Sequence, residues 1–326
     1  MLLKTRFARL VFAAAALSLP AAGFAQPAPY PSKPIRLVVP WAPGGTSDVP
    51  WRIIAPRLSE ALGQPIVVEN RPGAGSTLGA AVVAAVPPDG YTLLGTSNVL
   101  ALSANVYRKL QYDAVNDFVP IGQIAETCSV LVVHPSIPAN SVREFVSYVK
   151  ANPGKVDYAS TGNGSGQHLF MALFASMTGL SMNHIPYKNV GQSIAELVGG
   201  QVKANMPGLS VVLPHIKEGR LRALGVTCAK RSRFLPEAPT IDESGAPGFD
   251  TTLREGMLAP KGLPPDIAAR LERELRKVVE SPDTQKAILA TGNEPVFATS
   301  AQFGAMMRNE SAKWQKLVRE IGAYID

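Results

Sequence analysis

Apolar and polar positions follow a repeating order along the chain: a short apolar run, a polar loop rich in glycine, then apolar residues at helical spacing. The first instance is the clearest. Residues 35–39 form an apolar run that stops at Pro40, and a loop with Gly44 and Gly45 leads to a helix over residues 48–62. Thr46, Ser47 and Asp48 can each cap that helix. The pattern predicts a buried strand, a tight loop and a helix N-terminus.

The same arrangement recurs about 120 residues later, where a short strand over 156–159 is followed by a glycine-rich loop and a helix over 167–177. The first turn of a helix leaves backbone N–H groups unpaired and carries partial positive charge. Glycine lets a ligand approach the backbone closely. The two loops therefore predict two anion-receiving helix starts, although a plain strand-to-helix turn would also explain either one.

Strands and helices alternate through nearly the whole sequence, which predicts an α/β protein with largely parallel sheets. Because the glycine-rich loop occurs in two separate strand–helix series, we expect two lobes with a ligand cleft between them. The other expected strands cover residues 66–70, 91–95, 118–125, 130–133, 182–185, 201–206 and 221–228. The other expected helices end near residues 86, 152 and 198 or cover 209–217, 264–279, 282–290 and 300–321.

Two further loops carry possible ligand chemistry. Residues 71–79 hold glycines in the pattern G-x-G-x-x-x-G, which resembles the dinucleotide-binding fingerprint. The spacing before the last glycine is wrong, however, and the loop belongs to the second strand–helix unit, whereas a dinucleotide-binding fold uses its first. Close packing of a helix on the sheet explains these glycines better. Ser97 and Asn98 follow the strand over 91–95, and open α/β sheets bind ligands at such strand ends.

The sequence offers no catalytic or metal-binding constellation. Ser165 lacks the outer glycines of a nucleophile elbow. No paired carboxylates lie near the two glycine-rich loops, apart from the single Asp48, which we expect to cap or tie its own loop. The four histidines at positions 134, 168, 184 and 215 show no ligand spacing. We therefore expect binding without turnover, with no cofactor and no metal.

Residues 1–25 resemble a secretory signal peptide. Lys4, Arg6 and Arg9 precede an apolar stretch over 10–19 that is too short to span a bilayer, and cleavage is expected after Ala25. A retained anchor is the alternative. Cleavage would remove three of the seven net positive charges, and the remaining basic residues form no stripe with aromatics. We expect an exported, periplasmic protein with no nucleic-acid partner.

Cys128 and Cys228 are the only cysteines. An oxidising compartment permits a disulfide between them, but two separate thiols are the favoured interpretation. A bridge would lie where the chain crosses between the lobes and would stiffen their closure.

The chain resembles the Bug receptors, the extracytoplasmic solute-binding proteins of the tripartite tricarboxylate transporter class, from about Tyr30 to its C-terminus. The likeness rests on several short motifs that occur in order along the chain. They are Tyr-Pro-Ser-Lys-Pro-Ile at 30–35, Val-Val-Pro at 38–40 with Gly44, Gly45 and Asp48, Glu-Asn-Arg-Pro-Gly-Ala-Gly at 69–75, Pro-Asp-Gly-Tyr-Thr-Leu-Leu at 88–94, Tyr-Ala-Ser at 158–160, His-Ile-Pro-Tyr-Lys at 184–188 and Leu-Arg-Ala-Leu at 221–224.

The resemblance implies a two-lobed, type II-like periplasmic-binding-protein (Venus flytrap) fold, with a mainly parallel sheet in each lobe and a hinge of crossing strands. Residues 26–125 and 227–326 would form lobe 1, and residues 126–226 lobe 2. The loops at 44–48 and 161–166 would hold one carboxylate, with ordered water. The implied ligand-binding residues are Trp41, Ala42, Gly44, Gly45, Thr46, Asp48, Ser97, Asn98, Thr161, Asn163, Gly164, Ser165, Gly166 and Pro207.

The implied partners are a small carboxylate and TctA- and TctB-like permease subunits, or a sensor kinase to which the receptor presents its ligand; we expect a monomer. One departure from the family concerns the ligand. Many members carry an acidic residue just before the helix over 209–217, where it would meet the ammonium group of an amino acid. Residues 205–208 of this chain contain no acid. We therefore expect a non-amino carboxylate, such as a di- or tricarboxylate or an aromatic acid.

Overall fold

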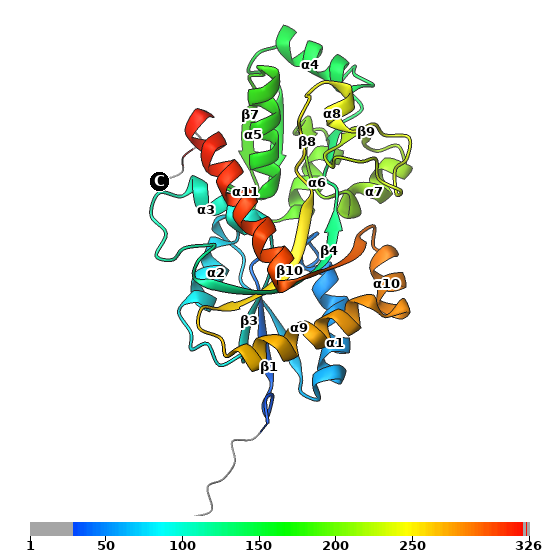
Figure 1. The fold of residues 1–326 in the computed structure, drawn as a ribbon. Helices are drawn as coiled ribbons and strands as arrows, with labels where there is room; N and C mark the ends of the chain where they lie inside the picture. Colours follow the sequence, from blue (N-terminus) through cyan, green and yellow to red (C-terminus); the bar gives the residue numbers. More distant parts are fainter. Residues whose placement is uncertain (1–28, 322–323, 325–326) are drawn as a thin grey trace, which may run out of the picture.

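The computed structural model describes residues 29–321 and 324, and the expected signal peptide and its cleavage site lie outside this range. The strands form two sheets, one of six strands in the order β11-β4-β10-β3-β1-β2 and one of five in the order β7-β6-β8-β5-β9. Helices cover both sheets, and the two halves lie one above the other in Figure 1. The α/β class and the two-lobed fold are thus confirmed.

The lobe with the larger sheet is built from both ends of the described chain. Its strands are β1 (Ile35–Val39), β2 (Ile66–Asn70), β3 (Thr92–Ser97), β4 (Phe118–Thr127), β10 (Leu253–Pro260) and β11 (Glu294–Thr299). Its helices are α1 (Val49–Leu62), η1 (Ala74–Ser76), α2 (Thr77–Ala84), α3 (Val99–Val106), α9 (Pro265–Glu280), α10 (Pro282–Leu289) and α11 (Ser300–Ile321). Trp51 of α1 is fully buried against Gly95 of β3, where a Cβ atom would approach the indole to 2.7 Å.

The lobe with the smaller sheet comes from the middle of the chain. Its strands are β5 (Val130–Val133), β6 (Asp157–Ser160), β7 (Asn183–Pro186), β8 (Ala204–Asn205) and β9 (Arg222–Val226). Its helices are α4 (Val142–Ala151), α5 (Gly166–Thr178), α6 (Val190–Val198), α7 (Leu209–Lys217) and α8 (Ile241–Ser244). Phe145 of α4 and Phe174 of α5 stack in its core.

Both sheets are mixed, whereas the sequence predicted mainly parallel ones. In the larger sheet β1 pairs in parallel with β2 and β3, but β10 and β11 pair antiparallel with their neighbours. In the smaller sheet β6 pairs in parallel with β7 and β8, while β5 pairs antiparallel with β8 and β9. The antiparallel pairs arise where β4 leaves the larger sheet and β10 returns to it, a change of direction that the order of elements does not reveal.

The lobes are joined at several places. The chain passes from β4 to β5 at residues 128–129 and returns from β9 to β10 over residues 227–252. This return segment, which the sequence placed in lobe 1, packs on the smaller lobe, since Phe249 lies edge-on to Phe174. Helix α11 rises from the larger lobe beside the smaller one (Figure 1), and its Trp314 packs against Phe170 of α5.

Cys128 and Cys228 form a disulfide, so the expectation of two separate thiols is wrong. Their Cα atoms lie 5.2 Å apart. Strands β5 and β9 pair with Val130 opposite Val226, and each cysteine lies two residues beyond that pair. The register of the sheet therefore brings together two residues that are 100 positions apart in the sequence.

Candidate functional site

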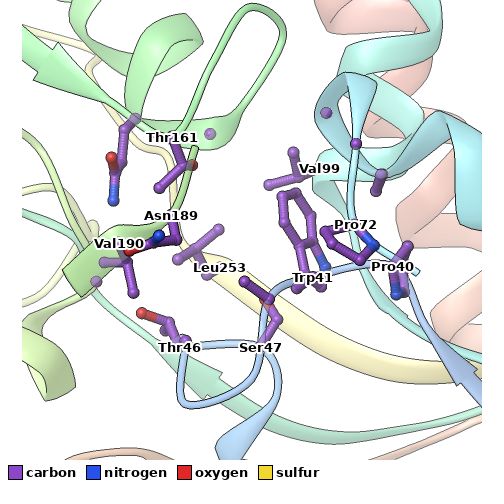
Figure 2. Close-up of a pocket in the computed structure, with 18 of the residues that line it drawn as sticks. Pro40, Trp41, Thr46, Ser47, Pro72, Val99, Thr161, Asn189, Val190 and Leu253 are labelled. Carbon is purple, nitrogen blue, oxygen red and sulfur yellow. The ribbon is translucent and has the colours of Figure 1, made fainter. Parts of the chain in front are cut away.

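A cavity of about 360 Å³ lies between the two lobes. Figure 2 shows Trp41, Pro72 and Val99 on one side of it, with Thr161, Asn189 and Val190 facing them. The wall contains one charged side chain, the exposed Lys188, and no Asp or Glu among the described residues. The lining residues are Pro40, Trp41, Ala42, Gly45, Thr46, Ser47, Pro72, Gly73, Ala74, Gly75, Ser76, Val99, Ser129, Thr161, Gly166, Gln167, Phe170, Tyr187, Lys188, Asn189, Val190, Gly208 and Leu253.

The first glycine loop (residues 44–48) is held by Asp48. The Asp48 carboxylate accepts hydrogen bonds from the Gly44 amide at 2.9 Å and from Asn70 Nδ2 at 2.7 Å, and it pairs with Arg52 at 3.2 Å. The Asp48 side chain is buried beneath the loop and does not line the cavity. Its position fixes the loop, whose amides at Thr46 and Ser47 donate to no residue in the described part of the chain.

The second glycine loop (residues 161–166) is held by both lobes. Ser103 Oγ of α3 donates to the Gly164 carbonyl at 2.7 Å, and the Tyr107 hydroxyl donates to the Asn163 carbonyl at 2.8 Å. Ser165 caps α5 by accepting from the His168 amide. Residues 163–165 therefore form hydrogen bonds that fix the loop. The neighbouring Thr161 and Gly166 line the cavity.

Two stacked histidines support the second loop from below. The Gly164 amide donates to His168 Nδ1 at 3.2 Å, and Ser160 Oγ hydrogen-bonds to His184 Nε2 at 2.6 Å. The two rings lie 4.2 Å apart. Burial, with His168 as a neighbour, lowers the pKa of His184 to about 4, and burial also lowers the pKa of His168. Both rings are therefore neutral near pH 7.

A third loop (residues 72–76) completes the wall. The sequence assigned its glycines to helix packing, and Gly79 does pack closely, since a Cβ atom there would meet Pro40 at 2.7 Å. Gly75 instead faces the second loop, where a Cβ atom would lie 2.5 Å from the Gly164 carbonyl oxygen. Because the third loop lies opposite the second one, it becomes part of the cavity only in the folded chain.

Of the residues singled out in the sequence, six line the cavity: Trp41, Ala42, Gly45, Thr46, Thr161 and Gly166. The other eight implied ligand-binding residues are not part of its lining: Gly44, Asp48, Ser97, Asn98, Asn163, Gly164, Ser165 and Pro207. Asn98 is buried and its side chain binds the chain at the start of β10. Its Nδ2 donates to the carbonyl of Thr252, just before the strand, and its Oδ1 accepts from the Arg254 amide. The Pro207 carbonyl accepts from the Val130 amide, and the next residue, Gly208, packs against Thr46.

Several polar atoms of the wall lack a partner. Ser76 Oγ, Ser129 Oγ and Trp41 Nε1 are buried and form no hydrogen bond among the described residues. The amides of Gly166 and Gln167, at the start of α5, also donate to no described residue. Buried donors are normally paired, so unpaired donors around one cavity indicate that a ligand or water completes their bonds. Donors from three loops with one nearby cation suit an anion.

Comparison with known proteins agrees with the geometry. Residues 51–323 match the family model "Tripartite tricarboxylate transporter family receptor". The chain is 38% identical to protein BugT of Bordetella pertussis over 296 residues, covering 90% of this chain and 91% of BugT. None of the described helices is both long and apolar enough to cross a membrane.

Two solved structures share the fold. The periplasmic binding protein BugD is 31% identical with a TM-score of 0.84, over 90% of this chain and 99% of BugD. Rpa4515 of R. palustris, solved with adipate, is 34% identical with a TM-score of 0.84, over 90% of this chain and 98% of that one. The chain therefore belongs to the tripartite tricarboxylate transporter receptor family, as its resemblance to the Bug receptors implied.

Proposed function

We propose that this protein captures a small carboxylate between its two lobes and delivers it to a tripartite tricarboxylate-type transporter. The supporting observation is the set of unpaired donors that three loops direct toward one cavity without an acidic side chain in its wall. Each hydrogen bond to a charged group contributes about 1.5–3 kcal/mol, so a few such bonds suffice for capture. The wall holds no base paired with a nucleophile, which favours binding without turnover.

The ligand we propose is a non-amino dicarboxylate. No acid lines the cavity to receive an ammonium group, and residues 205–208 supply none. One carboxylate would accept from the loop amides, and the Lys188 ammonium would pair with the second. The adipate of Rpa4515 is a ligand of this kind in a related fold. Trp41 and Phe170 also line the cavity, so an aromatic acid is the second candidate.

Calorimetric titration with adipate, citrate, malate, benzoate, aspartate and glutamate tests the ligand class. We expect adipate or another dicarboxylate to bind and glutamate not to bind. Tight binding of glutamate alone would contradict the non-amino assignment, and binding of none of these acids would contradict the carboxylate assignment. Native mass spectrometry of the protein as purified would reveal a retained solute.

The Lys188→Met variant tests the second half of the site. Because Lys188 is exposed, we expect the variant to weaken adipate by about two- to fivefold and to leave hexanoate, which has one carboxylate, nearly unchanged. Lys150→Met, on the outer face of α4, is the matched control and should change neither affinity. An equal loss of affinity for both acids would contradict the proposal that Lys188 binds the second carboxylate.

We further propose that the chain works in the periplasm as a monomer with TctA- and TctB-like permease subunits. The alternative partner is a sensor kinase to which the closed receptor presents its ligand. Deletion of TctA- and TctB-like permease genes from the host separates the two, because it should abolish uptake of the ligand but leave a ligand-induced transcriptional response intact.

A further inference from the structure

Glu255 is a buried acid beside the ligand cavity. Its side chain is 0% exposed on β10. Ser47 Oγ donates to its Oε1 atom at 2.6 Å, and its Oε2 atom has no hydrogen-bond partner in the described part of the chain. A fully buried carboxylate that accepts one hydrogen bond is costly to keep charged. The surroundings therefore favour the neutral acid.

The position of Glu255 links it to ligand capture. Ser47 belongs to the first glycine loop and lines the cavity, so a single hydroxyl group separates the buried carboxyl group from the ligand space. Leu253, two residues earlier on the same strand, also lines the cavity. Strand β10 is the one that follows the return segment into the larger sheet, and Glu255 lies between Ser97 of β3 and Ala125 of β4 in that sheet.

Among residues 29–321, no cationic side chain pairs with the Glu255 carboxyl group. On β3 and β4 its partners are Ser97 and Ala125, which carry no charge. In the first loop the nearest charge is Asp48, whose carboxylate is committed to Gly44, Arg52 and Asn70. Arg254, the next residue on β10, pairs with Glu126 at 3.9 Å and with Glu310 of α11 at 3.8 Å. None of these charged side chains therefore pairs with Glu255.

Burial raises the pKa of Glu255 to about 7, and the hydrogen bond from Ser47 opposes that shift. A bound anion on the other side of the Ser47 hydroxyl would repel the ionised form and favour the neutral one. Burial lowers the pKa of both histidines that support the second loop, that of His184 to about 4, so their shifts run opposite to that of Glu255.

We propose that Glu255 is a positioning residue that holds the first glycine loop through Ser47 and couples capture of the anionic ligand to uptake of one proton. The inference rests on the proposed function, because it requires an anion in the cavity. Affinity then falls as the pH rises from 6.5 to 8.5, and the neutral acid is the form that receives the ligand.

Calorimetric titration of the wild-type protein with adipate at pH 6.5, 7.5 and 8.5 tests the coupling. We expect the affinity to fall roughly tenfold over this range, because the neutral fraction of a carboxyl group with a pKa of about 7 falls by more than about tenfold between pH 6.5 and pH 8.5. At pH 7.5, titrations in phosphate and in Tris buffer should differ in heat by an amount that corresponds to uptake of up to one proton.

Three variants separate coupling from folding. Glu255→Gln keeps an acceptor for Ser47 and cannot ionise. Its affinity for adipate should therefore not depend on pH, and its heat of binding should be the same in phosphate and in Tris buffer. Ser47→Ala removes the hydrogen bond that lowers the pKa of Glu255, so the decline should move to higher pH. Glu274→Gln replaces another largely buried acid, on α9 away from the cavity, and should behave as wild type.

The outcomes distinguish this inference from the proposed function. If wild-type protein binds none of the acids tested, the carboxylate function fails and the coupling fails with it. If wild-type protein binds adipate with the same affinity at all three pH values and takes up no proton, the function stands and the role of Glu255 is refuted. A pH dependence that persists in Glu255→Gln would assign the proton to another group.

Discussion

The two glycine loops have similar sequences but are fixed by different means. The first is tied within its own lobe by a buried carboxylate, Asp48, which binds the Gly44 amide, Arg52 and Asn70. The second is supported by neutral histidines and receives hydrogen bonds from two residues of the other lobe, Ser103 of α3 and Tyr107 just after that helix. The hydrogen bonds of Asp48 therefore hold the first loop from within its own lobe, whereas the second loop receives part of its support from the other lobe.

Removal of the Asp48 side chain should have the largest effect. Asp48→Ala leaves the Gly44 amide without its acceptor and removes one of the two acceptors of Asn70 Nδ2. We expect a loss of about 3 kcal/mol in unfolding free energy, as for a buried charged group with several partners. Ser165→Ala, which removes only the cap of the second loop, should cost about 1 kcal/mol. Urea unfolding measures both. Equal losses would contradict the view that one buried carboxylate fixes the first loop.

A matched pair of glycine variants tests the role of closure. Gly44 and Gly164 both have left-handed φ, +76° and +74°. A Cβ atom at Gly44 meets nothing within 4 Å, but one at Gly164 would lie 2.8 Å from the Tyr107 ring of the other lobe. Both variants to alanine should lose about 1 kcal/mol of stability from backbone conformation.

Only Gly164→Ala should also resist closure, and we expect its ligand affinity to fall about tenfold further than that of Gly44→Ala, the equivalent of about 1.4 kcal/mol. Small-angle X-ray scattering with and without ligand should show that Gly164→Ala compacts less. Equal affinities for the two variants would mean that the second loop does not depend on the larger lobe.

Acid should weaken the hydrogen bonds that hold the second loop. We expect this effect to be smaller than those of the Asp48 and glycine variants. The pKa of His184 is lowered to about 4, so its neutral form contributes stability that is fully present above its ordinary value of 6.5 and is lost as the pH falls through about 4. Protonated His184 would disturb the bond to Ser160. We expect the ligand affinity to fall about twofold between pH 6 and pH 4, because about half of the molecules carry a protonated His184 at pH 4.

The variant His184→Gln, which keeps a polar partner for Ser160, should lower the affinity at pH 6 and remove most of the further decline toward pH 4. Acid titration of the bound ligand by intrinsic fluorescence would follow both proteins. If the affinity of the variant declined as much as that of the wild type between pH 6 and pH 4, His184 would not be the cause of the acid effect.

The sequence predicted the two glycine loops because their signals are local. An apolar run, glycines and capping residues lie within a dozen positions, and the same pattern occurs at residues 156–177. The third loop could not be predicted as part of the site, because its glycines also serve helix packing and its position opposite Gly164 depends on how the lobes meet.

Other elements were missed for physical reasons. Strand β10 carries Arg254 and Glu255 within a largely buried run, so it lacks the hydrophobic pattern of a strand. Helix α3 is buried on most sides and shows no polar face to mark helical spacing. Asn98 was expected to face the ligand, but it binds β10, a strand that the sequence did not predict.

The Cys128–Cys228 disulfide links the two ends of the chain segment that forms the smaller sheet. All five of its strands lie between Cys128 and Cys228, so the bond closes them into one macrocycle. A protease that cuts once inside this ring leaves a single molecule whose two fragments separate only after reduction. Such a nicked receptor would keep both ends of the ring attached to the larger lobe, and the binding half of the protein could survive damage that would divide an unbridged chain.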